Sequence, residues 1–394
     1  MSKDPIVIVG MARTPMGGML GDLSTVPSPV LGSIAIQSAV ERSGVNPADV
    51  DESIMGCCLM ANVGQAPARQ ASRKAGLPDS TGATTITKMC GSGMKAIMQG
   101  RDAIVAGSSE IVVAGGMENM SLAPHVMPNS RTGVKFGDSV MHDHMTRDGL
   151  HDAESHEPMG NYAEKCAEMY QFTREDQDAY AIESLKRAQR AITSGDFADE
   201  IVPVTISSRR GDTVVEIDEQ PGKARLDKIP TLRPAFKKDG TVTAANASSI
   251  SDGAAAVILT TASNAAAKGL TPIATLVAQS TNSLAPDMFT VAPIDCIKKV
   301  LDKAGWTAQD VDLFEINEAF AVVAMAAMKE LGLPHDKVNV NGGACALGHP
   351  IGASGARIII TLLNALKRRG LKKGIASLCI GGGEAVAVAV ELAD

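Results

Sequence analysis

Three glycine-rich turns, each carrying one reactive side chain, constrain this chain more than any other feature. They read KMCGSGMK around Cys90, GHPIGASG around His349 and LCIGGG around Cys379, and hundreds of residues separate the first turn from the other two. Glycine allows backbone N–H groups to approach a ligand closely. A cysteine in such a turn is a candidate nucleophile rather than a core residue. The three turns together predict a site for acyl transfer through a thioester.

Length and charge exclude several classes of protein. A chain of 394 residues is too long for one simple core and predicts two or three structural units. The net charge of −7 gives no electrostatic basis for binding nucleic acid or an anionic membrane. Aromatic residues make up only 3% of the chain, which also argues against a surface that stacks on bases.

Cysteine usage indicates a reducing compartment. The chain has seven cysteines, an odd number, and no C-x-x-C pair, so neither a disulfide framework nor a structural zinc site is expected. We expect no metal and no redox cofactor. The first residues lead from Met1 into the apolar run 6–9 without the pattern of a targeting or membrane-spanning segment, which predicts a cytoplasmic protein.

Residues 6–118 alternate strand-like and helix-like segments, a pattern typical of an α/β fold with a largely buried sheet. The expected strands are 6–9, 84–88 and 111–114, and the expected helices are 31–43, 66–75 and 92–106. The same pattern returns at residue 254. There the expected strands are 311–316, 338–340 and 375–380, and a helix is expected over 357–367.

The order of these parts repeats along the chain. In both stretches a strand leads to a glycine-rich turn, then to a helix, a further strand and a second run of glycines. This repetition predicts a duplicated α/β unit with the functional site between its halves.

Residues 119–248 differ in character and predict an inserted loop-and-helix domain. Five of the seven histidines lie here, without the spacing of metal ligands, and the charge is denser. The run from Thr173 to Asp176 is typical of a capped, exposed helix start. Such an insertion is suited to act as a substrate lid or binding arm.

Each reactive residue has a structural alternative. Cys90 precedes an expected helix, whose dipole favours the thiolate, although a small buried cysteine is common in cores. His349 is a candidate base for a thiol, or else a helix cap. Cys379 is a candidate acid/base, since a thiol has an ordinary pKa of roughly 8.5, or else a packing residue. The pair Cys57 and Cys58 lacks a glycine or histidine context and is interpreted as structural.

Two further groups complete the candidate catalytic set. The N–H of Gly381 is a candidate oxyanion donor after Cys379. Asn317, in NEAF after the strand 311–316, can hold a carbonyl oxygen or a water, or it can cap the next helix.

Four motifs, CGSG at Cys90, NEAF at Asn317, GHP at His349 and CIGGG at Cys379, occur in an order and spacing that resemble the thiolase family over essentially the whole chain. Within it, the chain is similar to the short-chain acetyl-CoA acetyltransferase group. The resemblance implies that Cys90 carries the acyl group, that His349 activates it, and that Cys379 moves the α-proton. It also implies one oxyanion hole from the N–H groups of Cys90 and Gly381, and another from His349 with a water held by Asn317.

The resemblance further implies two α/β halves in five αβαβα layers with a coenzyme A-binding loop domain, and a homodimer or homotetramer. On this reading residues 1–118 with 249–271 form one half, 119–248 the loop domain, and 272–394 the other half. Acetyl-CoA, acetoacetyl-CoA and coenzyme A are the implied substrates and products, in fatty-acid metabolism or polyhydroxybutyrate biosynthesis. The implied substrate-binding positions are Met159, Arg225, Phe236, Ala244, Ser248, Met288, Ala319 and Phe320.

This chain departs from the family pattern at two positions. Pro158 stands where short-chain members usually have a histidine beside the acyl pocket, and His156 is a possible substitute. Ser249 stands where a glycine usually follows the coenzyme A-binding serine. The first departure leaves open a broader 3-ketoacyl-CoA thiolase.

Two other functions are alternatives to that of a thiolase. A decarboxylating ketoacyl synthase would normally have a histidine or asparagine in place of Cys379. A non-catalytic acyl-CoA-binding protein would not need Cys90, His349, Asn317 and Cys379 all intact.

Overall fold

The strands of this computed structural model, which describes residues 4–209 and 211–393, form one mixed sheet and two small hairpins. Within the described residues, ten strands form the sheet in the order β12-β13-β14-β11-β1-β10-β5-β3-β4, with β2 paired to β10. Its strands are β1 (Ile6–Arg13), β2 (Gly17–Gly18), β3 (Glu52–Gly56), β4 (Gly82–Ile86), β5 (Val112–Asn119), β10 (Ser251–Thr261), β11 (Ala274–Ser283), β12 (Leu313–Ile316), β13 (Lys373–Ile380) and β14 (Glu384–Leu392).

The sheet consists of two similar halves, as the repeated sequence pattern predicts. In the first half β3 is parallel to β5, and β5, β10 and β1 follow in antiparallel order. In the second half β12 is parallel to β13, and β13, β14 and β11 follow in antiparallel order. Pairing of Val7 with Thr275 and of Ile8 with Ala274 joins the halves into one sheet. That junction is not anticipated by the sequence.

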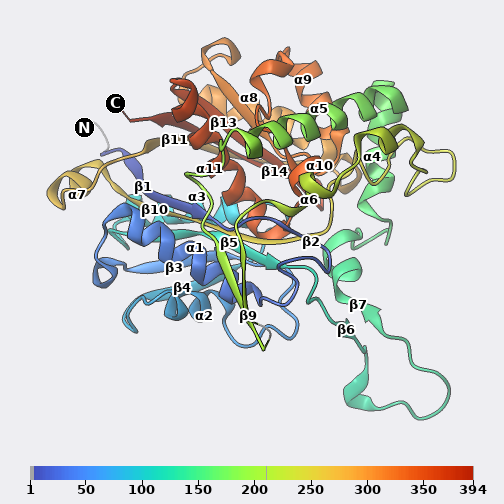
Figure 1. Cartoon of the computed structure of the whole chain (residues 1–394), viewed down its shortest axis with the longest axis horizontal. Helices are drawn as coiled ribbons and strands as arrows, with labels where there is room; N and C mark the ends of the chain where they lie inside the picture. The colour runs from blue at the N-terminus through green and yellow to red at the C-terminus, as the bar shows by residue number, and fades with distance from the viewer. Residues whose placement is uncertain (1–3, 210, 394) are drawn as a thin grey trace.

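Helices complete the five layers. Helices α1 (Ser28–Ser43) and α2 (Pro67–Lys74) pack outside the first half, and α8 (Ala292–Ala304) and α9 (Ala321–Leu331) pack on the second. Helices α3 (Ser92–Ala106) and α11 (Ile351–Arg369) share one core with strands of both halves and form the middle layer (Figure 1). The shorter helices are α7 (Ala262–Ala267) and α10 (Ala344–Leu347).

Glycines allow the two central helices to approach closely. A Cβ on Gly355 of α11 would lie 2.4 Å from the backbone nitrogen of Met94 in α3, and one on Gly93 would lie 2.9 Å from the nitrogen of Ala356. Real Cβ atoms do not approach backbone this closely, so only glycine fits at these positions. Because α3 starts just after Cys90 and α11 just after His349, this contact brings the two turns towards each other.

The segment from 119 to 248 contacts both halves. Helix α5 starts with the expected capping box, in which Thr173 and Asp176 each accept a backbone N–H from the other. Residues of α4 and α5 join the core of the second half, whereas Val204 and Val215 join that of the first. The part around β6 and β7 projects from the body (Figure 1). The segment contains β6 (His125–Val126), β7 (His142–Asp143), α4 (Met159–Tyr170), α5 (Arg174–Thr193), β8 (Val204–Ser208), β9 (Gly211–Val215) and α6 (Glu219–Lys223).

Short 3-10 and π turns connect these elements. They are η1 (Pro47–Asp49), η2 (Ser130–Thr132), η3 (Thr146–Leu150), η4 (Leu226–Thr231), η5 (Pro286–Val291), η6 (Ala308–Asp310) and η7 (His335–Lys337). Among the described residues, no helix combines the length and apolar character needed to cross a membrane.

The expected strand at 338–340 is wrong. Val338 makes only an isolated bridge with Phe314, because Asn339 has a φ of +48° and ends the extended run. The Asn339 side chain instead donates to the Ile316 carbonyl and to Glu318. The helix expected over 357–367 begins earlier, at Ile351, since Pro350 has a fixed φ suited to a helix start.

We expect Gly355→Val to destabilise the protein by about 1–3 kcal/mol or more, because the added side chain would overlap α3. The matched control is Gly222→Ala in α6, where a Cβ meets no atom within 4 Å and replacing glycine in a helix is neutral or mildly stabilising. Urea unfolding of both variants provides the measurement. Equal free energies of unfolding would contradict the close contact of α3 with α11.

Candidate active site

The turn that presents Cys90 is strained and tightly held. Met89, just before it, has a φ of +43°, an unfavourable conformation for a side chain of this size. The Ser92 hydroxyl stabilises the turn by accepting the Lys88 N–H at 2.8 Å and donating to the Met89 carbonyl at 2.7 Å. The result is a half-buried thiol at the N-terminal end of α3.

Burial favours the protonated form of Cys90. Burial raises the pKa of the Cys90 thiol to about 11, although hydrogen bonds from the backbone N–H groups of Gly381 and of Cys90 itself act to lower it. This direction is opposite to the effect expected of the helix dipole, which favours the thiolate. A base must remove its proton during the reaction.

Cys379 and Gly381 come from the other half and lie at the same place. Cys379 ends β13, is buried, and has its pKa raised well above the ordinary value, first by burial and then by the nearby Cys90 charge. The pKa of Cys379 is therefore higher than the ordinary thiol value on which the sequence prediction relied. Gly91 and Ile380 pack so closely that a Cβ on Gly91 would lie 2.4 Å from Ile380 Cδ1. The two cysteine turns therefore meet.

His349 is a buried neutral imidazole. Burial and the positive charge of Arg357 lower its pKa to about 3. The helix α11 has Pro350 as its N-cap residue and no side-chain cap, so the capping alternative for His349 is wrong. The residue Ile351, at the start of the same helix, packs in one cluster with Met89 and Cys90, which places this turn beside the nucleophile.

The hydrogen bonds of Ser354 determine which ring nitrogen of His349 carries the proton. His349 Nδ1 lies 2.5 Å from Ser354 Oγ, and the same hydroxyl donates to the Pro350 carbonyl at 2.9 Å. A serine hydroxyl has one proton, so Ser354 must accept from Nδ1–H. Nε2 is left with its lone pair, as a general base requires.

Asn317 contacts the imidazole and does not cap a helix. Helix α9 begins at Ala321 with Phe320 at the N-cap and no side-chain cap. The Asn317 side chain is buried, its Nδ2 lies 3.5 Å from each ring nitrogen of His349, and its Oδ1 accepts from Arg357 Nη2 at 3.4 Å. The following residue, Glu318, instead accepts from Tyr180, Ser184 and Asn339.

Sequence reasoning missed three side chains that support this centre. Ser354 and Arg357 lie on α11, and Glu118 lies at the end of β5. Arg357 and Glu118 could have been identified from the sequence, because each is a charged residue within an otherwise apolar segment. Cys58, interpreted as structural, lies beside the Cys90 turn, with its thiol 3.2 Å from the Met89 carbonyl and 3.3 Å from Ser92 Oγ.

An apolar wall adjoins Gly381. Met159 Sδ lies 3.5 Å from the position of a Cβ on Gly381, and Met159 and Met288 pack against the cluster that contains Ala319 and Phe320. Phe236 meets Phe320 edge to face, with ring centroids 6.0 Å apart, and covers Gly160.

The remaining binding predictions lie next to this wall or in an adjoining pocket. Ser248 donates its N–H to the Ala319 carbonyl. A pocket of about 300 Å³ is lined by residues that include Arg225, Ala244 and Ser249. The backbone carbonyl of Ser249 accepts the backbone N–H of His349 at 3.2 Å, which connects this pocket with the catalytic turn. His156 is exposed and hydrogen-bonds with Arg147, so nothing places it at the acyl wall.

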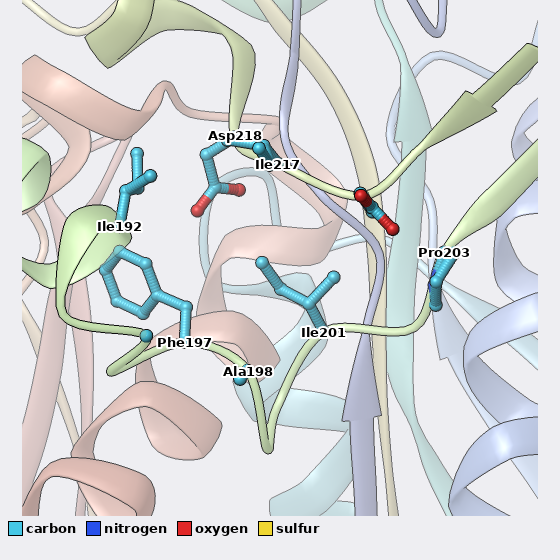
Figure 2. A pocket seen from close by; sticks show the side chains of 9 residues that line it. Ile192, Phe197, Ala198, Ile201, Pro203, Ile217 and Asp218 are labelled. Carbon is cyan, nitrogen blue, oxygen red and sulfur yellow. The ribbon is translucent and has the colours of Figure 1, made fainter.

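A second pocket lies elsewhere, and Glu216 and Asp218 are the acidic residues that line it. Figure 2 shows it lined largely by apolar side chains such as Phe197 and Ile201. Its buried Asp218 is already paired with Arg13 at 2.7 and 2.9 Å. In the part of the chain that the structure describes, no group of three or more His, Cys, Asp or Glu is arranged to hold a metal ion.

Comparison with known proteins gives one consistent family. Residues 6–263 match the thiolase N-terminal domain and residues 270–392 match the thiolase C-terminal domain. An acetyl-CoA acetyltransferase of Cupriavidus necator is 52% identical over 98% of this chain and 99% of that protein. Acetyl-CoA acetyltransferase 2 of Arabidopsis thaliana is 50% identical over 98% and 97%. The crystal structure of the Bacillus anthracis acetyl-CoA acetyltransferase has a TM-score of 0.96 at 44% identity, with 99% of both chains covered.

Alkylation of Cys90 by iodoacetamide should rise about tenfold per pH unit between pH 7 and 9, because a thiol with a pKa of about 11 is almost entirely protonated in this range. Peptide mass mapping measures the rate, and Cys90→Ala identifies the signal. A rate that levels off by pH 8 would show that the thiolate is already formed.

Replacing Ser354 by alanine should lower kcat about tenfold to hundredfold, since the proton on Nδ1 of His349 loses its acceptor and general-base catalysis contributes roughly 10²–10⁴-fold. Ser280→Ala is the matched control, because Ser280 is equally buried but donates to the Cys296 carbonyl. Steady-state kinetics of thioester cleavage give kcat for both variants. Equal kcat values would rule out the role of Ser354.

Proposed function

The chain belongs to the thiolase family, and we propose that it is an acetyl-CoA C-acetyltransferase that joins two acetyl-CoA molecules reversibly into acetoacetyl-CoA and coenzyme A. The observation that carries this proposal is the meeting of two thiols from different halves, with the Gly381 N–H directed at the Cys90 sulfur. One thiol can carry the acyl group while the other moves a proton.

In the first half-reaction Cys90 attacks the thioester carbonyl of acetyl-CoA. Its proton passes to Nε2 of His349 as the sulfur–carbon bond forms, because the resting thiol and imidazole are both neutral. The tetrahedral oxyanion is stabilised by the N–H groups of Cys90 and Gly381. As the oxyanion collapses, the carbon–sulfur bond to coenzyme A breaks and His349 returns the proton to the leaving thiolate.

In the second half-reaction Cys379 passes its thiol proton to Nε2 of His349, which is free again, and the resulting thiolate removes the α-proton of another acetyl-CoA; the proton on His349 later returns to the Cys90 thiolate. The enolate oxygen is stabilised by His349 and by a water held by Asn317, as family resemblance implies. Its carbon attacks the acetyl group on Cys90, a carbon–carbon bond forms, and the Cys90 thiolate leaves and is reprotonated.

The adjoining pocket suits the polar part of coenzyme A. Three cations, Lys223, Arg225 and Lys228, line it together with Ala244. Cations of this kind favour phosphate groups. Ser249 lines the same pocket and its carbonyl accepts the backbone N–H of His349, so the pocket leads towards the catalytic turn, which is the direction that the pantetheine arm must take.

The apolar wall formed by Met159, Met288 and Phe320 bounds the space for the acyl group. This wall supports a short acyl chain over the alternative of a broad 3-ketoacyl-CoA thiolase. Pro158 leaves this wall without the polar ring that short-chain members usually have there.

An assembly of two or four copies is also part of the proposal, together with a cytoplasmic location. The segment around β6 and β7 exposes a group of large apolar side chains, and Phe136 among them is fully exposed. Such a group is unusual on the surface of a monomeric protein and typical of an interface. The exposed apolar residues of this segment are Leu122, Met127, Val134, Phe136, Val140 and Met141. A second copy of the chain would cover them.

The proposed roles separate in two substitutions. We expect Cys90→Ala to abolish covalent acetylation by acetyl-CoA, and Cys379→Ala to become acetylated on Cys90 but to condense at least about a hundredfold more slowly, because its general base is gone. Mass mapping follows the acetyl group and a coenzyme A release assay follows turnover.

Condensation at the wild-type rate by Cys379→Ala would overturn its role. A series of 3-ketoacyl-CoA substrates on the wild type then tests the acyl class. Comparable cleavage of longer chains would favour the broad-specificity alternative, and absence of any covalent acyl group would leave only a binding protein.

A further inference from the structure

A buried arginine links the helix of His349 to the strand of Asn317. Arg357 lies on α11, eight residues after His349, and its side chain is fully buried. Its guanidinium donates to Glu315 Oε1 at 3.2 Å and to Asn317 Oδ1 at 3.4 Å. Glu315 lies in β12 and Asn317 directly follows the strand, so the two acceptors are two residues apart and one fork of donors spans both.

This contact determines which end of the Asn317 amide faces the catalytic centre. The two ends of an amide have nearly the same shape but opposite hydrogen-bonding roles. A guanidinium has only donors, so the amide group that meets Arg357 must be the oxygen. The NH₂ group is then directed at the His349 ring, 3.5 Å from each of its nitrogens.

The backbone hydrogen bond of Asn317 does not determine the orientation of its side-chain amide. Its N–H donates to the Ser377 carbonyl, which fixes the strand end but leaves the side-chain amide free to rotate. Among the hydrogen bonds of the described residues, the Oδ1 of Asn317 is engaged by Arg357.

Stability alone does not account for the buried pair. Removing two charges from water is costly, and well-packed apolar residues of similar size often serve a core as well or better. The Nε of Arg357 also has no hydrogen-bond partner in the structure, so the guanidinium is not fully satisfied. A geometric role next to the reacting groups explains why a charge is kept here.

We propose that Arg357, anchored by Glu315, is a positioning residue that holds Asn317 with its amide donor towards the acyl-transfer centre. The inference rests on the proposed function, because it assigns the Asn317 donor to the water that stabilises the enolate oxygen there. Arg357 itself does not touch substrate. Its effect on the reaction is exerted through Asn317.

A double-mutant cycle tests this directly. Arg357→Met should lower kcat for acetoacetyl-CoA thiolysis about tenfold to hundredfold with KM changed no more than a few-fold, since a misdirected catalytic group costs turnover more than binding. In an Asn317→Ala background the same substitution should cause no further loss of kcat. An equal loss of kcat in both backgrounds would overturn the proposal, because it would mean that Arg357 acts independently of Asn317.

The matched control is Arg187→Met. Arg187 is also a buried arginine, but it donates to the carbonyls of His335, Val338 and Asn339 and not to the Asn317 side chain. Any fall in kcat that it causes should be the same factor with and without Asn317. Dependence of the Arg187 effect on Asn317 would mean that a general loss of order produces the same pattern, and would also overturn the proposal.

Two safeguards keep the test decisive. If Arg357→Met does not fold, Glu315→Gln combined with Arg357→Met leaves no unpaired buried charge and replaces it in the cycle. If the wild type does not cleave acetoacetyl-CoA, the proposed function fails, and a neutron crystal structure of the Arg357→Met variant, which distinguishes amide nitrogen from oxygen, then tests the inference alone. There, an Asn317 amide that keeps its NH₂ group on His349 would contradict the proposal, and a rotated amide would support it.

Discussion

The close packing of α3 against α11 is the contact on which the catalytic arrangement depends. Each helix begins immediately after a reactive residue, Cys90 or His349, and their glycines let the backbones approach to a distance that no side chain would allow. Both helices lie between the two halves of the sheet. The position of the nucleophile relative to its base is thus determined by helix packing in the core rather than by flexible loops.

A buried carboxylate strengthens this junction. Glu118, at the end of β5, accepts the N–H groups of Cys58 and Leu59 from the first half and that of Gly352 from the start of α11 in the second. An anion is favoured at the N-terminal end of a helix. Burial raises the pKa of Glu118, while these N–H groups act to lower it. The loop beside Cys90 and the first turn of α11 are therefore held by one side chain.

The sequence identifies which residues form the site better than it predicts their protonation and their side-chain partners. Repeated strand–turn–helix patterns identify the duplicated halves, and glycines beside Cys90, His349 and Cys379 identify the turns. Local patterns cannot show that β1 pairs with β11, because that contact joins segments more than 250 residues apart. Nor do they show that burial raises the pKa of Cys90, or that Ser354 contacts His349 and Arg357 contacts Asn317, since desolvation and side-chain partners arise only in the folded core.

A resting site of neutral groups follows from this burial, and charge must develop only as the thioester reacts. The proposed chemistry requires thiols from the two halves of the chain to share one centre. Treatment of the wild type with 1,3-dibromoacetone, a short reagent that can alkylate two thiols, tests this claim. Peptide mapping should find Cys90 and Cys379 joined, with activity lost in parallel. Cys90 joined to Cys58 instead, or alkylated without a second attachment, would contradict the claim.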